Sequence, residues 1–174
     1  EAGLRTLVEQ RLELPGSRQL LLLILDGVQD PHNLGACLRT AEAAGVDAVV
    51  VPRHGAAGLG PAVSKVAAGA AEALPFARVP NLGRVLDWLR DYGVTIYGTS
   101  DKSEFSLYDS NFDRPLALVM GREESGLSKA VARRCDVVLA LPMHGTVASL
   151  NVSVATGICL FEVLRQRCTA VAEP

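Results

Sequence analysis

Short apolar runs alternate with segments of helical periodicity along most of the chain. The apolar runs have the length of β-strands and stand at residues 20–25, 46–51, 76–79, 94–97, 115–120 and 136–141. The intervening segments predict helices over residues 34–44, 61–73, 81–92, 127–134 and 151–167. Because several strands are apolar on both faces, the pattern predicts an α/β fold with a mostly parallel sheet and helices on both faces.

The first residues differ in character from the rest of the chain. Residues 1–17 are polar and contain Pro15-Gly16, so we expect an N-terminal approach segment or linker, followed by one domain over residues 18–174. The chain does not begin with methionine, and we expect it to have been cut from a longer protein. Neither a membrane-spanning run nor a signal peptide is predicted, since the longest apolar run, at residues 20–25, is strand-sized.

The composition is that of a globular protein rich in aliphatic residues. Hydrophobic residues make up 49% of the 174 and aromatic residues 5%, so the core is expected to consist mostly of Leu, Val, Ile and Ala. A net charge of -2 argues against a broad, non-specific nucleic-acid binder, although it allows a local basic patch. The cysteines form no Cys-x-x-Cys pair, and we expect buried free thiols at Cys37, Cys135, Cys159 and Cys168.

Ligands of open parallel sheets gather where strands end and helices begin, and three such loops carry unusual residues. In the first loop, Asn33 stands at the expected start of a helix and Arg39 on its second turn. Asn33 either caps the helix or serves a functional site. Arg39 lies close to the buried stripe of the helix, where an arginine often has an assigned partner such as a phosphate.

The second and third loops are rich in small and polar residues. Residues 121–127 place two glycines around two carboxylates after a buried strand, either as a ligand loop or as a simple turn into a helix. They match neither a dinucleotide-binding nor a phosphate-loop pattern. Residues 142–151 precede a long helix, where free N–H groups attract anions, although Ser149 or Asn151 alternatively caps that helix. No metal pattern is formed by the histidines at positions 32, 54 and 144.

Together the three loops resemble the three motifs of the TrmH family of SPOUT methyltransferases. The matching segments are residues 25–35 with 39–41, residues 119–123 with 126–127, and residues 141–143 with 149–155. The resemblance covers residues 20–167. It implies a SPOUT-type fold whose C-terminal part forms a deep trefoil knot, which is an exception to the usual topology rules.

The resemblance also implies an activity, a cofactor and partners. Proteins of this kind are S-adenosylmethionine-dependent RNA ribose 2'-O-methyltransferases that work as cytoplasmic homodimers without a metal. Within the family, the likeness points to methylation of a guanosine in 23S rRNA. Such proteins usually carry a small N-terminal RNA-binding domain, which is expected to be absent from this chain. The sequence departs from the family at Arg122, where a smaller residue is common, and at Glu124, where glycine is common.

The site residues of the family carry over position by position. Cofactor contacts are implied first for Gly121, Leu141 and Leu150, largely through backbone atoms, and then for Met120, Thr99 and Met143. The active-site set corresponds to Asn33, Arg39, Glu123, Ser149 and Asn151. Because a guanidinium is a poor base, we expect Arg39 to grip the RNA phosphate beside the target ribose. Asn33 and Glu123 are expected to hold Arg39 and the ribose in place.

Other functions stay open at this point. A tRNA ribose methyltransferase or an antibiotic-resistance rRNA methyltransferase shares the same motifs. A non-catalytic RNA-binding or ribosome-assembly module would keep the fold without the chemistry, but the joint presence of the active-site residues speaks against it. A small-molecule nucleotide-binding protein would need a phosphate loop, or an acidic ribose-binding residue at the right place after a Gly-rich turn, and the sequence has neither. Four basic residues could either contribute to a basic surface that binds RNA or be ordinary surface charges. They are Arg53, Lys65, Arg78 and Arg114.

Overall fold

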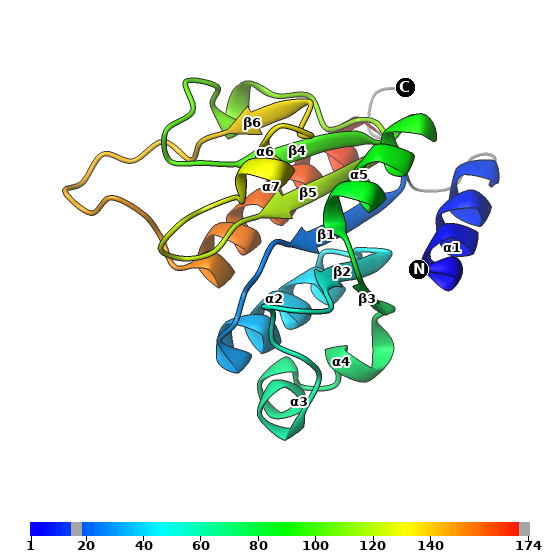
Figure 1. Cartoon of the computed structure of the whole chain (residues 1–174). Helices are drawn as coiled ribbons and strands as arrows, with labels where there is room; N and C mark the ends of the chain where they lie inside the picture. Colours follow the sequence, from blue (N-terminus) through cyan, green and yellow to red (C-terminus); the bar gives the residue numbers. More distant parts are fainter. Residues whose placement is uncertain (15–18, 171–174) are drawn as a thin grey trace.

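The centre of the molecule is a six-stranded sheet with the strand order β3-β2-β1-β5-β4-β6, in which every pair of neighbours is parallel (Figure 1). The computed structural model describes residues 1–14 and 19–170. The strands are β1 (Leu21–Leu25), β2 (Ala48–Pro52), β3 (Phe76–Val79), β4 (Thr95–Thr99), β5 (Leu116–Met120) and β6 (Val137–Leu139). Because all strands run the same way, the loops that follow them open at one edge of the sheet.

Alternate residues of the central strands enter two separate hydrophobic cores. Leu21, Leu23 and Leu25 of β1 belong to one core, whereas Leu22 and Ile24 belong to the other. Every residue of β1 and β5 is buried. This burial on both faces explains why the strands read as continuous apolar runs in the sequence.

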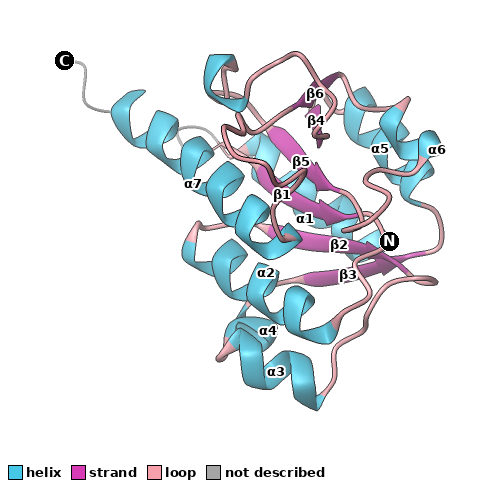
Figure 2. Ribbon diagram, turned by 90° about the vertical axis from the view of Figure 1, so that its left-hand side faces the viewer, coloured by secondary structure: helices cyan, strands magenta, loops and turns pink. Residues whose placement is uncertain are grey.

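Helices cover the two faces of the sheet in two groups (Figure 2). The helices are α1 (Ala2–Glu13), α2 (Pro31–Ala43), α3 (Pro61–Ala67), α4 (Ala70–Ala73), α5 (Leu82–Asp91), α6 (Lys129–Ala132) and α7 (Val152–Ala170), with a 3-10 turn, η1, at Leu107–Asp109. Buried residues of α2, α3, α4 and α7 line one core, and those of α1, α5 and α6 line the other. The predicted α/β fold with a parallel sheet and helices on both faces is confirmed.

Two predicted helices differ from the structure. The segment 61–73 forms α3 and α4 instead of one helix, because Ala68 and Gly69 adopt left-handed φ angles of 52° and 94°. The helix predicted over 127–134 is reduced to the four residues of α6. The buried carboxylate of Asp26 accepts a hydrogen bond from the Ser128 N–H over 2.7 Å. This hydrogen bond holds the residues before Lys129 as a loop, so the helix begins later than predicted.

The polar N-terminal segment packs on the sheet. Residues 2–13 form α1, whose Leu4 and Val8 are buried in the core shared with α5. Arg11 adds an ion pair with Asp47, with 3.0 Å between Nε and Oδ1. Residues 15–18, where the linker was expected to end, lie outside the described residues.

Three of the cysteines are shielded from solvent, as expected. Cys37 and Cys159 are buried and Cys135 is partly buried, but Cys168 in the last turns of α7 is exposed, contrary to the prediction. Burial raises the pKa of the Cys37 thiol to about 11 and the pKa of the Cys135 and Cys159 thiols to about 12. These three side chains are therefore neutral thiols near pH 7, and neutral thiols are poor nucleophiles.

Candidate active site

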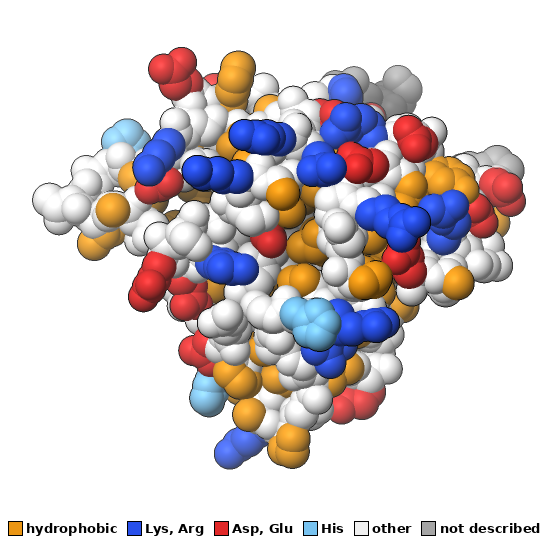
Figure 3. Space-filling view, viewed as in Figure 1, with side chains coloured by type: hydrophobic (Ala, Val, Ile, Leu, Met, Phe, Trp, Pro, Cys, Tyr) orange, Lys and Arg blue, Asp and Glu red, His pale blue; other side chains and the backbone are white. Residues whose placement is uncertain are grey.

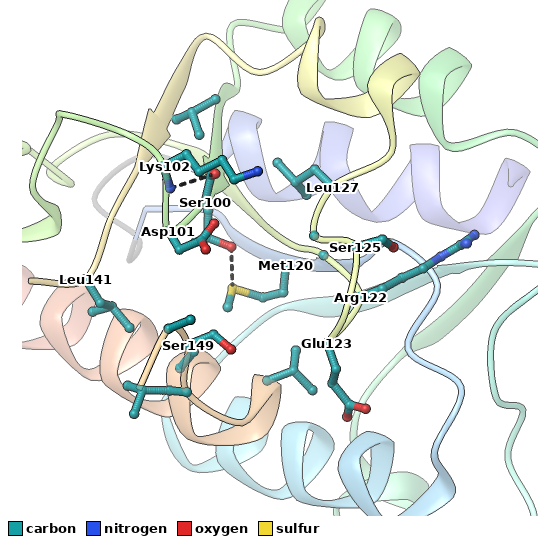
Figure 4. Close-up of a pocket in the computed structure, with 18 of the residues that line it drawn as sticks. Ser100, Asp101, Lys102, Met120, Arg122, Glu123, Ser125, Leu127, Leu141 and Ser149 are labelled. Carbon is teal, nitrogen blue, oxygen red and sulfur yellow. Dashed lines mark hydrogen bonds between the residues drawn. The ribbon is translucent and has the colours of Figure 1, made fainter. Parts of the chain in front are cut away.

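A cavity of about 460 Å³ opens at the carboxyl edge of the sheet (Figure 4). Its walls are the segments that follow β4, β5 and β6, together with the segment that leads into α7. The loops 121–127 and 142–151, which the sequence singled out, thus meet at one place. The cavity lies where ligands of open parallel sheets commonly bind.

All the residues with an implied cofactor contact line this cavity, although they come from distant parts of the chain. They are Thr99, Met120, Gly121, Leu141, Met143 and Leu150. The hydroxyl of Thr99 donates to the carbonyl oxygen of Val119 over 3.3 Å, which holds the end of β4 against β5. The sequence therefore located the walls of the cavity correctly, while the contacts themselves remain a prediction.

The loop that follows β5 folds back tightly on itself. Arg122 and Gly126 exchange two backbone hydrogen bonds, of 2.9 and 3.0 Å. A Cβ atom on Gly121 would stand 2.2 Å from the carbonyl carbon of Gly126 and 2.4 Å from the nitrogen of Leu127. Any side chain at position 121 would collide with this backbone, so the cavity wall consists of bare main chain there.

A chain of side-chain hydrogen bonds joins the three loops at the border of the cavity. The side-chain amide of Asn33 donates to a carboxylate oxygen of Glu123, and Asn151 Nδ2 donates to Asn33 Oδ1 over 3.0 Å. Asn151 Oδ1 accepts in turn from the N–H and the hydroxyl of Ser153, at 2.9 and 2.6 Å. Each amide is oriented by its neighbours, and Glu123 is the final acceptor of the chain.

The two asparagines differ in what they do for their helices. Asp30 caps α2, because its carboxylate accepts from the His32 N–H over 2.8 Å. This hydrogen bond is also the main reason why the pKa of Asp30 is lowered. Asn151 accepts from the Ser153 N–H in the first turn of α7, as a cap does, and still donates to Asn33. Asn33 is therefore not needed as a cap, whereas Asn151 has two roles.

Ser149 and Arg39 have different positions relative to the cavity. Ser149 lines it, on the segment before α7 (Figure 4). Arg39 is exposed on α2, and its side chain has no hydrogen bond or ion pair within the described part of the chain. It lies six positions after Asn33, which is roughly 240° around a helix. The structure thus does not bring Arg39 to Asn33 and Glu123 within one chain, unlike what the sequence led us to expect.

Sequence reasoning missed several polar residues of the site. Ser100, Asp101 and Lys102 line the cavity directly after β4, and the Lys102 N–H donates to Ser100 Oγ over 3.2 Å. Asp26 directly after β1 belongs to the first family motif, but its role was not foreseen: it positions the end of the loop 121–127 through Ser128. Their place immediately after parallel strands was the available signal, because such positions share one edge of the sheet.

Two classes of feature are not found in the part of the chain that the structure describes. Residues 1–14 and 19–170 contain no group of three His, Cys, Asp or Glu side chains that is arranged to bind a metal ion. No helix in these same residues has the length and apolar character that crossing a membrane requires.

The family described as SpoU rRNA Methylase matches residues 20–161, a range that contains the whole cavity and all three loops. The chain belongs to this family. Its sequence is 55% identical over 154 residues to the 23S rRNA (guanosine-2'-O-)-methyltransferase RlmB of Photobacterium profundum, covering 88% of this chain and 63% of that protein. The chain spans about three fifths of the length of the curated relatives it matches. The resemblance recognised in the sequence is confirmed.

Solved structures of SpoU proteins share the fold. The SpoU methyltransferase AviRb from Streptomyces viridochromogenes, in complex with the cofactor AdoMet, is 31% identical with a TM-score of 0.82, covering 89% of this chain and 63% of that one. The A. aeolicus TrmH/SpoU tRNA modifying enzyme is 28% identical with a TM-score of 0.81, covering 98% of this chain and 87% of that one. Two solved SpoU proteins, one of them named for tRNA modification, therefore share the fold of this chain.

Proposed function

We propose that the chain transfers a methyl group from S-adenosylmethionine to the ribose 2'-OH of a guanosine in 23S rRNA. The observation that carries the proposal is a cofactor-sized cavity bordered by the hydrogen-bonded side chains of Asn33, Glu123 and Asn151. Relatives that are 53–55% identical to the chain are named for this activity. The proposal combines their activity with the presence here of the whole cavity and the residues at its border.

The cavity has the size and the lining that S-adenosylmethionine needs. Its volume of about 460 Å³ lies within the range of roughly 300–1,000 Å³ that is usual for small-molecule sites. Met120 and Leu141 offer apolar surface, and the bare backbone at Gly121 allows close approach. Asp101 and Glu123 bring carboxylates to a ligand that carries a sulfonium and an ammonium group. When bound, the cofactor supplies a methyl group that its positive sulfur has already activated.

The residues at the border of the cavity are suited to hold the accepting ribose. Transfer requires alignment of the 2'-oxygen with the methyl group and assistance in removing the hydroxyl proton. Asn33 donates to one oxygen of the Glu123 carboxylate, which leaves the other oxygen to accept from the substrate. The Ser149 hydroxyl lines the cavity on the opposite segment. Together these groups fix the ribose and do not form a covalent intermediate with it.

A second copy of the chain completes this site in our proposal. Val154 and Phe161 of α7 are 50% and 48% exposed and lie seven positions apart, so they form one apolar stripe with Ile158 between them. α7 lies beside α2, where the Cys37 thiol meets the Thr156 hydroxyl at 3.6 Å. A homodimer that buries this stripe also covers the α2 side, and it directs Arg39 of one copy toward the cavity of the other. Arg39 then grips the RNA phosphate next to the target ribose.

We also propose that the C-terminal part is threaded as a deep trefoil knot. Arg167 near the end of α7 donates to the carbonyl oxygens of Phe112 and Arg114, on the connection between β4 and β5, over 3.2 and 2.8 Å. It also donates to the carbonyl oxygen of Leu20, just before β1, over 3.2 Å. Contacts of α7 with both segments support the passage of the chain through the β4–β5 connection, which is rare in proteins.

A tRNA ribose methyltransferase is the second candidate, since a solved relative of high structural similarity is a tRNA modifying enzyme. The rRNA activity is preferred, because identity to that tRNA enzyme is 28% whereas identity to the named 23S rRNA enzyme is 55%. A 23S rRNA substrate would place the protein in the cytoplasm, with the ribosomes.

The test is methyl transfer from labelled S-adenosylmethionine to separate RNA substrates. Fragments of unmodified 23S rRNA, unmodified 16S rRNA and unmodified tRNA are each offered to the chain under identical conditions. We expect label in 23S rRNA alone. Label in tRNA alone would favour the second candidate, and a chain that binds the cofactor but labels no RNA would favour a non-catalytic role.

A further inference from the structure

The side chain of Arg122 occupies an unusual position between two loops. A Cβ atom on Gly27 would stand 2.5 Å from Arg122 Nε, so the guanidinium lies directly over this glycine, whose φ angle is +87°. A Cβ atom on Gly55, in the loop after β2, would stand 3.9 Å from Arg122 Nη2. Because a side chain at position 27 would displace it, Gly27 creates the space in which Arg122 lies.

A second guanidinium, that of Arg78, lies against another glycine of the loop after β2. Arg78 Nη1 stands 3.4 Å from where a Cβ atom on Gly58 would be, and Arg78 Nη2 donates to the carbonyl oxygen of Arg53 over 2.7 Å. We call the exposed residues Arg53, His54, Arg78 and Arg122 the basic edge. They follow or end β2, β3 and β5, so they belong to the carboxyl edge of the sheet. Lys and Arg side chains are also visible beside a histidine on this face in Figure 3.

The basic edge begins at the wall of the cavity, because Arg122 belongs to the loop that lines it. Figure 4 shows Glu123 pointing toward α2, whereas Arg122, its neighbour in the chain, points in a different direction, away from the cavity. The backbone of Arg122 is fixed by its two hydrogen bonds with Gly126. Neither Arg122 nor Arg78 forms an ion pair with a carboxylate among residues 1–14 and 19–170. Within the described part of the chain, the guanidinium groups of Arg78 and Arg122 thus have no carboxylate partner.

We infer that the basic edge binds phosphates of the RNA strand beside the target ribose, through the Arg122 side chain, which points away from the cavity, and through the residues beyond it. This inference rests on the proposed transfer to RNA. A guanidinium presents a planar set of donors that matches phosphate oxygens, and glycine backbone beneath it allows the RNA to approach closely. Arg122 acts as a positioning residue: it holds the substrate strand and does not touch the reacting atoms.

The experiment measures steady-state methyl transfer to a 23S rRNA fragment as a function of salt. For Arg122→Ala we expect a KM for RNA raised about five- to tenfold, with kcat within about twofold and the affinity for S-adenosylmethionine unchanged. The slope of log KM against log salt falls by about 0.7–0.9, which corresponds to one lost phosphate contact. Arg122→Lys keeps the charge and restores most of the affinity for RNA.

Arg114→Ala is the matched control, because Arg114 is also exposed but precedes β5 and lies at the opposite edge of the sheet. It should leave the KM and the salt slope as in the wild type. An Arg122→Ala variant with wild-type KM and slope overturns the inference, and so does one that loses affinity for the cofactor, because Arg122 would then only shape the loop.

A direct RNA-binding measurement distinguishes failure of this inference from failure of the proposed methyl transfer. If the wild type transfers no methyl group, direct binding of the same RNA fragment is measured by filter retention. RNA binding that weakens with Arg122→Ala and not with Arg114→Ala supports the basic edge without catalysis. Equal binding by both variants and the wild type contradicts it.

Discussion

Asn33 and Asn151 are 118 positions apart in the sequence, and the side-chain amide of Asn151 donates to the side-chain oxygen of Asn33 over 3.0 Å. This bond fixes which way the Asn33 amide faces, because an oxygen that accepts from Asn151 leaves the nitrogen to donate to Glu123. Asn151 is itself fixed by Ser153. The orientation of the Glu123 carboxylate is thus set from the first turn of α7.

Breaking this chain should impair turnover more than cofactor binding. We expect Asn33→Asp to lower kcat by about two orders of magnitude, since a second carboxylate would replace the donor to Glu123. Asn151→Ala should have a smaller effect of the same kind. In a double-mutant cycle, Asn33→Ala and Asn151→Ala should be clearly non-additive. Additive losses would mean that the two residues act independently.

The fold class could be predicted from local patterns, whereas the residues expected around the cofactor came from the resemblance to the family motifs. β1 and β5 are buried on both faces and therefore read as continuous apolar runs, and Gly121 follows β5 directly. The start of α6 could not be predicted in the same way, because the hydrogen bond between Asp26 and the Ser128 N–H spans 102 positions. Nor could periodicity show that Ala68 would adopt a left-handed conformation and divide one predicted helix into two.

The position of Arg39 relative to Asn33 could not be predicted from the sequence motif. Its resemblance to a family motif implied a role beside Asn33, but a helix places residues six positions apart on different sides. Whether such residues serve one site depends on a second copy of the chain, and no pattern within a single sequence contains that copy. Asp101 and Lys102 could not be predicted for a different reason: they follow a strand without any motif, and the order of the strands in the sheet brings them to the cavity.

The role of the bare backbone at position 121 can be tested by the substitution Gly121→Ala, which adds a single Cβ atom. Gly121→Ala should weaken the binding of S-adenosylmethionine at least about tenfold, or about 1.4 kcal/mol, because its Cβ displaces Gly126 and Leu127 from the cavity wall. Isothermal calorimetry measures this affinity. Gly145→Ala is the matched control, since nothing lies within 4 Å of a Cβ atom there, and it should bind like the wild type. Equal affinities for all three proteins would contradict the assigned wall.

The role of Arg39 across a dimer predicts rescue between two inactive variants. Arg39→Ala and Asn33→Asp chains are each expected to retain only about 1% of the wild-type activity or less when tested alone. When they are mixed and allowed to exchange, heterodimers contain one intact site, so random pairing should restore about a quarter of the wild-type activity. Methyl transfer to RNA before and after exchange provides the measurement. No rescue from chains that demonstrably exchange would place Arg39 in the site of its own chain or outside the reaction.

The cysteines should differ sharply in reactivity. A thiol reagent at pH 8 is expected to label Cys168 rapidly, whereas Cys37, Cys135 and Cys159 stay unlabelled in the folded protein, because they are shielded and their pKa values are raised by burial. Mass spectrometry of the labelled peptides identifies the sites. The Cys168→Ser variant should take up almost no label until it is unfolded in urea. Rapid labelling of Cys159 in the folded protein would be inconsistent with the described packing of α7.

Glu162 should make stability depend on pH. Its carboxylate is buried, and two hydrogen bonds of 2.8 Å from Arg165 are the main cause of its lowered pKa. Since the folded pKa lies below the ordinary value of 4.5, the stabilisation is complete above that value and is lost as the pH falls through the folded pKa. Urea unfolding should show Glu162→Gln less stable than the wild type at pH 7, with a smaller difference at pH 3.5. A difference independent of pH would mean that the ion pair is not its source.

The central claim is methyl transfer to a ribose 2'-oxygen of guanosine, and the nature of the labelled product tests it most directly. RNA is cleaved by alkali through attack of the 2'-OH on the adjacent phosphate, so a linkage with a methylated 2'-oxygen survives. After reaction of 23S rRNA with the chain and methyl-labelled S-adenosylmethionine, we predict that alkaline hydrolysis leaves the label in a dinucleotide whose first residue is guanosine. Label recovered in mononucleotides would show methylation of a base and would contradict the account.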